Sequence, residues 1–191
     1  MTSHSSPAFA NVRYVFLDRD GVINRKLAEG EYVSSWHHVQ ILPGAEEAIA
    51  RLNRSGRTVI VITNQRGVAL GYYTEADVRA VHEELQRHLN QSGARIDAFY
   101  FCPHDKNQCN CRKPKTGLFE QAVKDFPEAS GTNSIVIGDS LSDIEAARNF
   151  GAASIFIDGD PKFQKPGTEK ARELADAYCQ SLSEAVNRFL P

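Results

Sequence analysis

The sequence lacks the features that would place the chain in a membrane or on a nucleic acid. Its 191 residues carry 22 basic and 24 acidic side chains, and a formal net charge of −2 provides no basic surface for nucleic acids or anionic membranes. Purely apolar runs are short, as at 59–62, and fall far below the length of a membrane-spanning helix. Four cysteines, three of them within ten residues, do not resemble a disulfide framework. We therefore expect neither a nucleic acid nor a membrane as a partner.

The chain also lacks a secretory signal and any feature that would divide it into domains. Residues 1–11 are rich in Ser and Ala and show no basic segment followed by an apolar block. We expect a cytoplasmic protein with a flexible N-terminal tail at 1–12. No internal repeat, charge block or linker interrupts the remainder, and 41% of the residues are apolar, which is enough for one well-buried core. We predict a single domain over 13–191 that acts as a monomer.

Short apolar runs alternate with longer amphipathic segments along the chain. Runs rich in β-branched and aromatic residues predict buried strands at 14–17, 59–62, 98–101, 134–137 and 154–157. Apolar residues at helical spacing predict helices at 45–53, 74–90, 118–126, 143–150, 169–178 and 183–190. Strands that alternate with helices form parallel sheets with crossover connections. The predicted fold is therefore α/β, a Rossmann-like three-layer sandwich around a mostly parallel sheet.

Polar residues follow three of the predicted strands at the points where the strands end. Asp18 and Asp20 follow the first strand, Thr63 the second and Asp139 the fourth. In open α/β sheets, ligands bind at the carboxyl ends of the strands. A single Asp-x-Asp is usually a turn, but polar groups at three strand ends indicate a functional site. Close carboxylates repel one another unless a cation neutralises them, and such oxygen ligands suit Mg²⁺.

Four ordered motifs resemble those of the haloacid dehalogenase (HAD) superfamily of phosphohydrolases. They are Asp18-Arg19-Asp20-Gly21-Val22, then Thr63, then Lys113, and finally Gly138-Asp139-Ser140 followed by Asp143, and the match extends from about residue 14 to residue 158. The resemblance implies a HAD-like fold and a Mg²⁺-dependent phosphatase that works through an aspartyl phosphate.

The same resemblance implies a role for each motif residue. Asp18 would be the nucleophile, and Asp20 would protonate the leaving oxygen and then activate water. Thr63 would hydrogen-bond the transferring phosphoryl group, and Lys113 would neutralise its charge. Asp18, the backbone carbonyl of Asp20, and Asp139 would hold Mg²⁺.

Three cysteines and a histidine cluster just before Lys113. Cys102, His104, Cys109 and Cys111 provide four soft or borderline ligands within ten residues. Three thiolates and one imidazole form the closed tetrahedral set that is typical of structural Zn²⁺. Ordinary buried thiols or a reactive pair are the alternative, although the loop holds little apolar material. We expect zinc to fix the segment that presents Lys113.

The loop with these four ligands resembles that of one branch of the superfamily, which contains heptose bisphosphate phosphatases and histidinol-phosphate phosphatases. Segments 21–43 and 65–97 are too short for an inserted cap domain, so we predict a capless enzyme. Substrate contacts are expected from the loop 24–36 and from Asn64, Gln65, Arg112 and Lys113. The guanidinium of Arg112 suits a second, non-reacting phosphate, and a surface carboxylate is its alternative partner.

Two positions of the fourth motif leave alternatives open. Asp143 either orients Lys113 or a metal-bound water, or is simply an acid that the first turn of a helix favours. Ser140 stands where some heptose phosphatases of the branch have a basic residue, which bears on sugar and anomer preference.

The functional hypothesis is a Mg²⁺-dependent phosphatase that removes the 7-phosphate of D-glycero-D-manno-heptose 1,7-bisphosphate. That reaction belongs to nucleotide-activated heptose biosynthesis, which supplies lipopolysaccharide, capsule or S-layer glycans. The alternative enzyme is a histidinol-phosphate phosphatase of histidine biosynthesis. A zinc-stabilised binding module without catalysis is the alternative of another class, and the complete set of motif residues argues against it.

Overall fold

Six parallel strands form the central sheet of the computed structural model, which describes residues 9–28, 30–164 and 166–190. The strands are β1 (Tyr14–Leu17), β2 (Thr58–Asn64), β3 (Ala98–Cys102), β4 (Ser134–Gly138), β5 (Ala153–Ile157) and β6 (Ala177–Cys179). Their order is β3-β2-β1-β4-β5-β6, so β1 pairs with β2 on one side and with β4 on the other. The strand order therefore reverses between β1 and β4, where ligand crevices form in such sheets.

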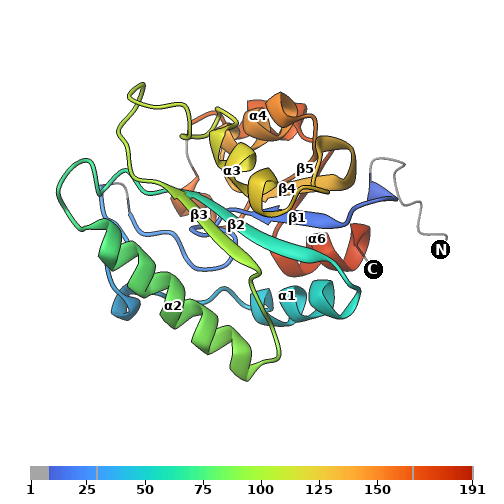
Figure 1. The fold of residues 1–191 in the computed structure, drawn as a ribbon, viewed down its shortest axis with the longest axis horizontal. Coiled ribbons are helices and arrows are strands. Elements are labelled where there is room, and N and C mark those ends of the chain that lie inside the picture. Colours follow the sequence, from blue (N-terminus) through green and yellow to red (C-terminus); the bar gives the residue numbers. More distant parts are fainter. Residues whose placement is uncertain (1–8, 29, 165, 191) are drawn as a thin grey trace.

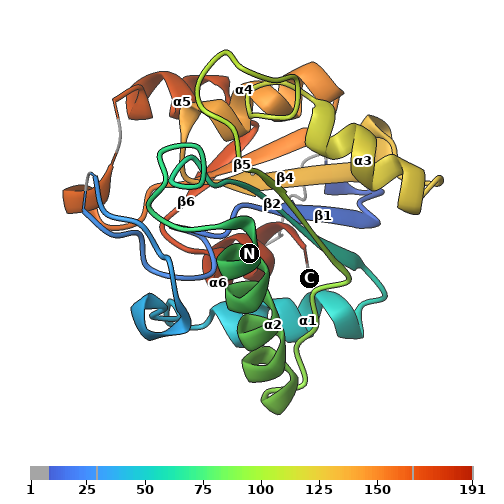
Figure 2. The same cartoon turned by 60° about the vertical axis from the view of Figure 1, so that its left-hand side comes forward.

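Helices cover both faces of this sheet (Figures 1 and 2). One face packs against α1 (Ala45–Arg54), α2 (Glu75–Gln91) and α6 (Leu182–Phe189). The other packs against α3 (Gly117–Asp125), α4 (Leu141–Phe150) and α5 (Thr168–Leu174). Side chains alternate across β1, so Val15 and Leu17 enter the first layer of core and Phe16 enters the second. The predicted three-layer α/β sandwich is confirmed.

Local signals begin and end helices near the predicted positions. The Thr74 hydroxyl accepts a hydrogen bond from the Asp77 amide at 3.2 Å, and the Asp77 carboxylate accepts one from the Thr74 amide at 2.7 Å. This reciprocal capping box satisfies two amides that the first turn of α2 leaves free. Gly151, in the left-handed region at φ 80°, follows the last residue of α4.

Two stretches differ from the predictions. The helix expected at 169–178 ends at Leu174, and Ala177–Cys179 is the edge strand β6 instead. The carboxylate of Asp176 accepts hydrogen bonds from the amide and hydroxyl of Ser154, at 2.8 and 3.1 Å, which holds this segment beside β5.

The second difference concerns the N-terminus. Of the predicted tail at 1–12, residues 1–8 lie outside the described residues. Phe9 and Val12 are buried, and the ring of Phe9 packs against that of Phe189 with centroids 5.0 Å apart. The packed chain therefore begins before residue 13.

No inserted domain follows β1 or β2 in the part of the chain that the structure describes. The connection from β1 to α1 contains only a short 3-10 turn at Trp36–His38, and β2 leads to α2 without further helix or strand. The described residues thus include no cap domain. None of their helices is long and apolar enough to cross a membrane.

Candidate active site

The turn after β1 places Asp18 against the end of β4. The amide of Asp18 donates to the carbonyl of Ile137 at 3.0 Å, which continues the ladder between the two strands. Gly21 adopts φ 97°, and a Cβ there would overlap the carboxylate of Asp139. Glycine is therefore required for the chain to pass this close to the end of β4.

Lys113 links the segment after β1 with strand β2 and helix α4. Its ammonium lies 3.1 Å from Asp18 Oδ1, 2.6 Å from Asp143 Oδ1 and 2.7 Å from the carbonyl of Ile62, and its side chain is 1% exposed. Burial acts to lower the pKa of Lys113, but the carboxylates of Asp143 and Asp18 raise it overall. Lys113 is therefore a buried cation, held against the predicted nucleophile.

Asp143 combines two of the arrangements left open by the sequence. Its Oδ2 accepts hydrogen bonds from the amide and hydroxyl of Ser140, at 3.0 and 2.6 Å, and so caps the first turn of α4. Its Oδ1 contacts Lys113 at the same time. A Cβ on Gly138 would overlap the Asp143 side chain, so the glycine permits this approach.

Three carboxylates form a group that fits a divalent cation. One oxygen each from Asp18, Asp139 and Asp143 lies within 4.8 Å of the others. Asp139 Oδ1 is buried and has no hydrogen-bond partner among the described residues, whereas its Oδ2 contacts the ammonium of Lys26. Burial raises the pKa of Asp139 to about 6; Lys26 opposes this effect, and Asp18 and Asp143 add to it. Hard oxygen ligands of this kind suit Mg²⁺.

Asp20 lies in a separate hydrogen-bond network. Arg19 Nη2 donates to its Oδ2 at 2.8 Å, Asn24 Nδ2 donates to Oδ1 at 2.9 Å, and Gln65 Nε2 donates to Oδ2 at 3.1 Å. Burial acts to raise the pKa of Asp20, but the Arg19 charge and these hydrogen bonds hold it below its usual range. Asp20 is therefore ionised at neutral pH.

Arg19 and His82 belong to this network and were missed by the sequence reasoning. Arg19 is completely buried, and its Nη1 lies 3.2 Å from His82 Nε2. Arginine can only donate, so Nε2 of His82 is the acceptor and the ring is neutral. Burial, followed by the Arg19 charge, lowers the pKa of His82 to about 3. The position of Arg19 between two aspartates was the one available signal; nothing in the sequence indicated His82.

Thr63, Asn64 and Gln65 bind protein groups at the end of β2. Thr63 Oγ1 accepts from Gln65 Nε2 at 2.9 Å. Asn64 exchanges two hydrogen bonds with the backbone of Lys113, at 3.1 and 3.2 Å. The side chains of Asn64 and Gln65, predicted to contact substrate, thus position Lys113 and Asp20 in this structure.

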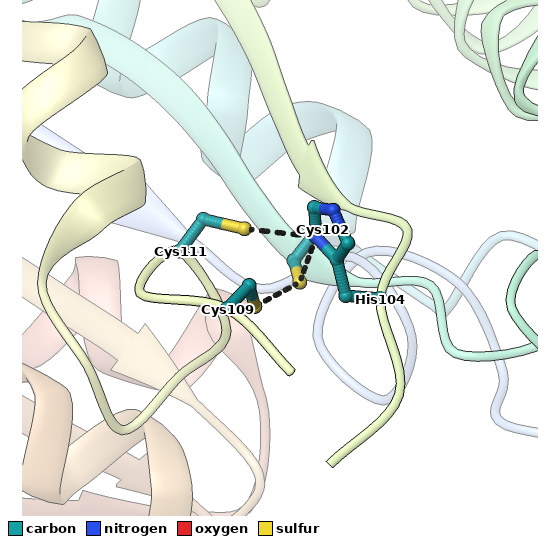
Figure 3. Close-up of side chains that lie close together, drawn as sticks. All are labelled: Cys102, His104, Cys109 and Cys111. Atoms are coloured by element: carbon teal, nitrogen blue, oxygen red, sulfur yellow. Dashed lines mark hydrogen bonds between the residues drawn. The ribbon is translucent and has the colours of Figure 1, made fainter. Parts of the chain in front are cut away.

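Cys102, His104, Cys109 and Cys111 converge as predicted (Figure 3). Cys102 Sγ lies 3.5 Å from Cys109 Sγ and 3.7 Å from His104 Nδ1, and Cys111 Sγ lies 3.3 Å from the same nitrogen. A tetrahedral ion with metal–sulfur bonds of about 2.3 Å and metal–nitrogen bonds of about 2.0 Å would separate its ligands by about 3.5–3.8 Å. The four side chains can therefore bind one such ion.

This cluster directly precedes the segment that carries Lys113. The Arg112 amide donates to Cys109 Sγ at 3.4 Å, and Arg112 Nη1 donates to the carbonyl of His104 at 3.4 Å. The Arg112 guanidinium thus contacts the cysteine loop itself, and its positive charge adds to the hydrogen bond from Arg66 in lowering the pKa of Asp105 in the same loop.

Comparisons with known proteins agree with this geometry. Residues 110–185 match the family described as HAD-hydrolase-like. The chain is 45% identical over 171 residues to the D-glycero-α-D-manno-heptose-1,7-bisphosphate 7-phosphatase of Mycobacterium bovis, covering 89% of this chain and 87% of the relative. It is 34% identical over 184 residues to the D-glycero-β-D-manno-heptose-1,7-bisphosphate 7-phosphatase of Vibrio cholerae, covering 92% and 95%.

A solved structure is similar over nearly the whole chain. The D,D-heptose 1,7-bisphosphate phosphatase from B. bronchiseptica, complexed with magnesium and phosphate, superposes with a TM-score of 0.78 at 31% identity. The match covers 92% of this chain and 97% of that chain.

Proposed function

Because this chain belongs to the D-glycero-D-manno-heptose-1,7-bisphosphate 7-phosphatase family of HAD-like hydrolases, we propose that it removes the 7-phosphate of a heptose 1,7-bisphosphate. It is thus a phosphoric monoester hydrolase. The observation that carries the assignment of its chemistry is the contact of Lys113 with Asp18, beside the carboxylates that end β4. This contact sets a carboxylate nucleophile next to a buried cation.

The proposed reaction begins with attack of Asp18 on phosphorus. An Asp18 oxygen bonds to the phosphoryl group as the bond to the sugar oxygen breaks, and an aspartyl phosphate forms. The ammonium of Lys113 stabilises the negative charge on the transferring group. When held by Asp18, the Asp20 carbonyl and Asp139, Mg²⁺ supplies further positive charge to the phosphoryl oxygens. Asp139 Oδ1 supports this ligand set because it is buried without another partner among the described residues.

Asp20 carries the proton through the proposed cycle. It gives a proton to the sugar oxygen in the first step and takes one from the water that hydrolyses the aspartyl phosphate. Asp20 therefore ends each cycle in the protonation state in which it began. The Arg19, Asn24 and Gln65 contacts favour the carboxylate form that the second step requires. The lowered pKa of Asp20 applies to the substrate-free protein, and in the cycle the proton taken from water is the one that Asp20 gives in the next turnover.

We propose that the cysteine loop holds a structural Zn²⁺. Four protein ligands leave no open position for substrate, and the loop leads directly into Lys113. Metal binding would therefore hold the backbone that carries the catalytic ammonium. Thiolate ligands of this kind persist in a reducing compartment, which supports a cytoplasmic protein. We also infer that the protein works as a monomer, since its proposed site is assembled within one chain.

A panel of substrates tests the proposed function. Purified enzyme with Mg²⁺ is assayed on both anomers of D-glycero-D-manno-heptose 1,7-bisphosphate, because the relatives' names divide between α and β. Histidinol phosphate and simple hexose phosphates complete the panel. We expect the highest kcat/KM on one heptose bisphosphate; a clear preference for histidinol phosphate would overturn the substrate assignment.

A further inference from the structure

Lys26 brings a second ammonium group to the carboxylates of the site. Its Nζ contacts Asp139 Oδ2, and its side chain is only 12% exposed. The contact spans 113 positions of the sequence, from the loop after β1 to the end of β4. Lys26 therefore reaches a predicted ligand of the magnesium ion from a position outside the four motifs.

The residue that follows Asp139 cannot provide this charge. Ser140 is neutral, and its hydroxyl is used by the carboxylate of Asp143 in the helix cap, at 2.6 Å. The positive charge beside Asp139 comes from Lys26, whereas the ammonium of Lys113 contacts Asp18 and Asp143.

Lys26 changes the net formal charge of the group of carboxylates. The carboxylates of Asp18, Asp139 and Asp143 and the two lysine ammonium groups leave the group with a charge of −1. A divalent cation would bring this to +1, which attracts a phosphate dianion. Without Lys26 the same metal-bound group would be neutral. The ammonium thus opposes binding of a cation and favours binding of an anion.

A small cavity of about 80 Å³ adjoins this contact. Arg25 and Lys26 line it together with Gly21 and Asp139, and residues 158–160 and 163–164, which follow β5, line it as well. The loop after β1 therefore presents two cations to a space that borders the predicted metal ligand.

The acidic side of this cavity is partly neutralised. The carboxylate of Asp158 binds Arg172 Nε at 2.6 Å and is 5% exposed. Asp160 accepts a hydrogen bond from the amide of Lys162 at 3.0 Å. The ammonium of Lys26 contacts the carboxylate of Asp139. A phosphate oxygen can bind the same ammonium, either in place of Asp139 or together with it.

We propose that Lys26 is a substrate-binding residue that binds a phosphate oxygen of the substrate beside Asp139 and weakens Mg²⁺ binding to the substrate-free enzyme. This inference rests on the proposed phosphatase function. Lys26 thus weakens Mg²⁺ binding and strengthens phosphate binding. A lysine with a purely structural role would not produce two effects of opposite sign.

Two variants and a control test the proposal by calorimetry, without turnover. Lys26→Met keeps the length of the side chain and removes its charge, Lys26→Arg keeps the charge, and Lys124→Met changes an exposed lysine of α3. Mg²⁺ is titrated into each substrate-free protein, and inorganic phosphate is titrated into each protein saturated with Mg²⁺.

For Lys26→Met we expect Mg²⁺ to bind about three- to tenfold more tightly, because a neighbouring positive charge is gone. Inorganic phosphate should bind about tenfold more weakly, because a charge-assisted hydrogen bond is lost. Lys26→Arg should restore most of both affinities, and Lys124→Met should match the parent.

Unchanged affinities in Lys26→Met, or a shift of both in the same direction, would overturn the proposal. A parent protein that binds Mg²⁺ and phosphate with these Lys26 effects, yet does not hydrolyse heptose bisphosphates, would refute the proposed substrate and leave the role of Lys26 intact.

Discussion

His82 should make the protein sensitive to mild acid. Its ring is buried, lies 3.2 Å from the Arg19 guanidinium and stacks on Phe99 with centroids 4.6 Å apart. Burial and the Arg19 charge lower its pKa to about 3 in the folded protein, whereas the unfolded chain has a histidine pKa of about 6.5. As pH falls below 6.5 the unfolded state binds a proton and the folded state does not, so stability is lost from about pH 6.5 down to about pH 3.

The size of this loss follows from the two pKa values. At pH 7 about a quarter of the unfolded molecules carry a proton on this histidine, and at pH 5 nearly all do. Integration of the proton difference between these pH values gives about 2 kcal/mol of unfolding free energy lost through His82 alone. The loss is large because a folded domain has only about 5–15 kcal/mol of stability.

Urea unfolding of the parent, His82→Gln and His37→Gln at pH 7 and pH 5 measures the effect. Glutamine retains an acceptor for Arg19 but does not titrate, and His37 is an exposed control. His82→Gln should be less stable than the parent at pH 7 by about 1 kcal/mol. Its disadvantage should disappear or reverse at pH 5, while His37→Gln follows the parent. An equal loss of stability between pH 7 and pH 5 in the parent and His82→Gln would refute this reasoning.

Three further perturbations address the site and its supports. Asp18→Asn should reduce kcat about a thousandfold or more while leaving the circular dichroism spectrum unchanged, because the nucleophile is lost; substantial turnover would contradict the assignment of Asp18. Cys109→Ser should lower the free energy of unfolding by at least about 2 kcal/mol and remove bound zinc from metal analysis, and a variant as stable as the parent would count against the structural role. Gly138→Ala should destabilise the protein by about 1–3 kcal/mol, because its Cβ would overlap the Asp143 side chain; denaturation curves that coincide with those of the parent would show that the overlap is relieved without loss.

Much of the fold was predictable because its signals are local. The runs at 14–17 and 134–137 are strands β1 and β4 over nearly the same residues, since buried parallel strands are apolar on both faces. Strand β6 was predicted as helix because only its pairing with β5 and the Asp176 contact with Ser154 define it. A three-residue edge strand leaves no pattern long enough to read.

The sequence by itself determined five of the six strands, the order of the four motifs and the presence of a Cys₃His ligand set, because periodicity and ligand chemistry lie within short segments. Tertiary structure decided which groups meet. Arg19 and His82 are 63 positions apart, and Lys26 and Asp139 are 113 positions apart. Their contacts arise only when the fold brings the loop after β1 against helix α2 and against the end of β4, and burial removes water from the charges. Because water no longer screens these charges, His82 stays neutral beside Arg19 and Lys26 acts strongly on the carboxylates of the site.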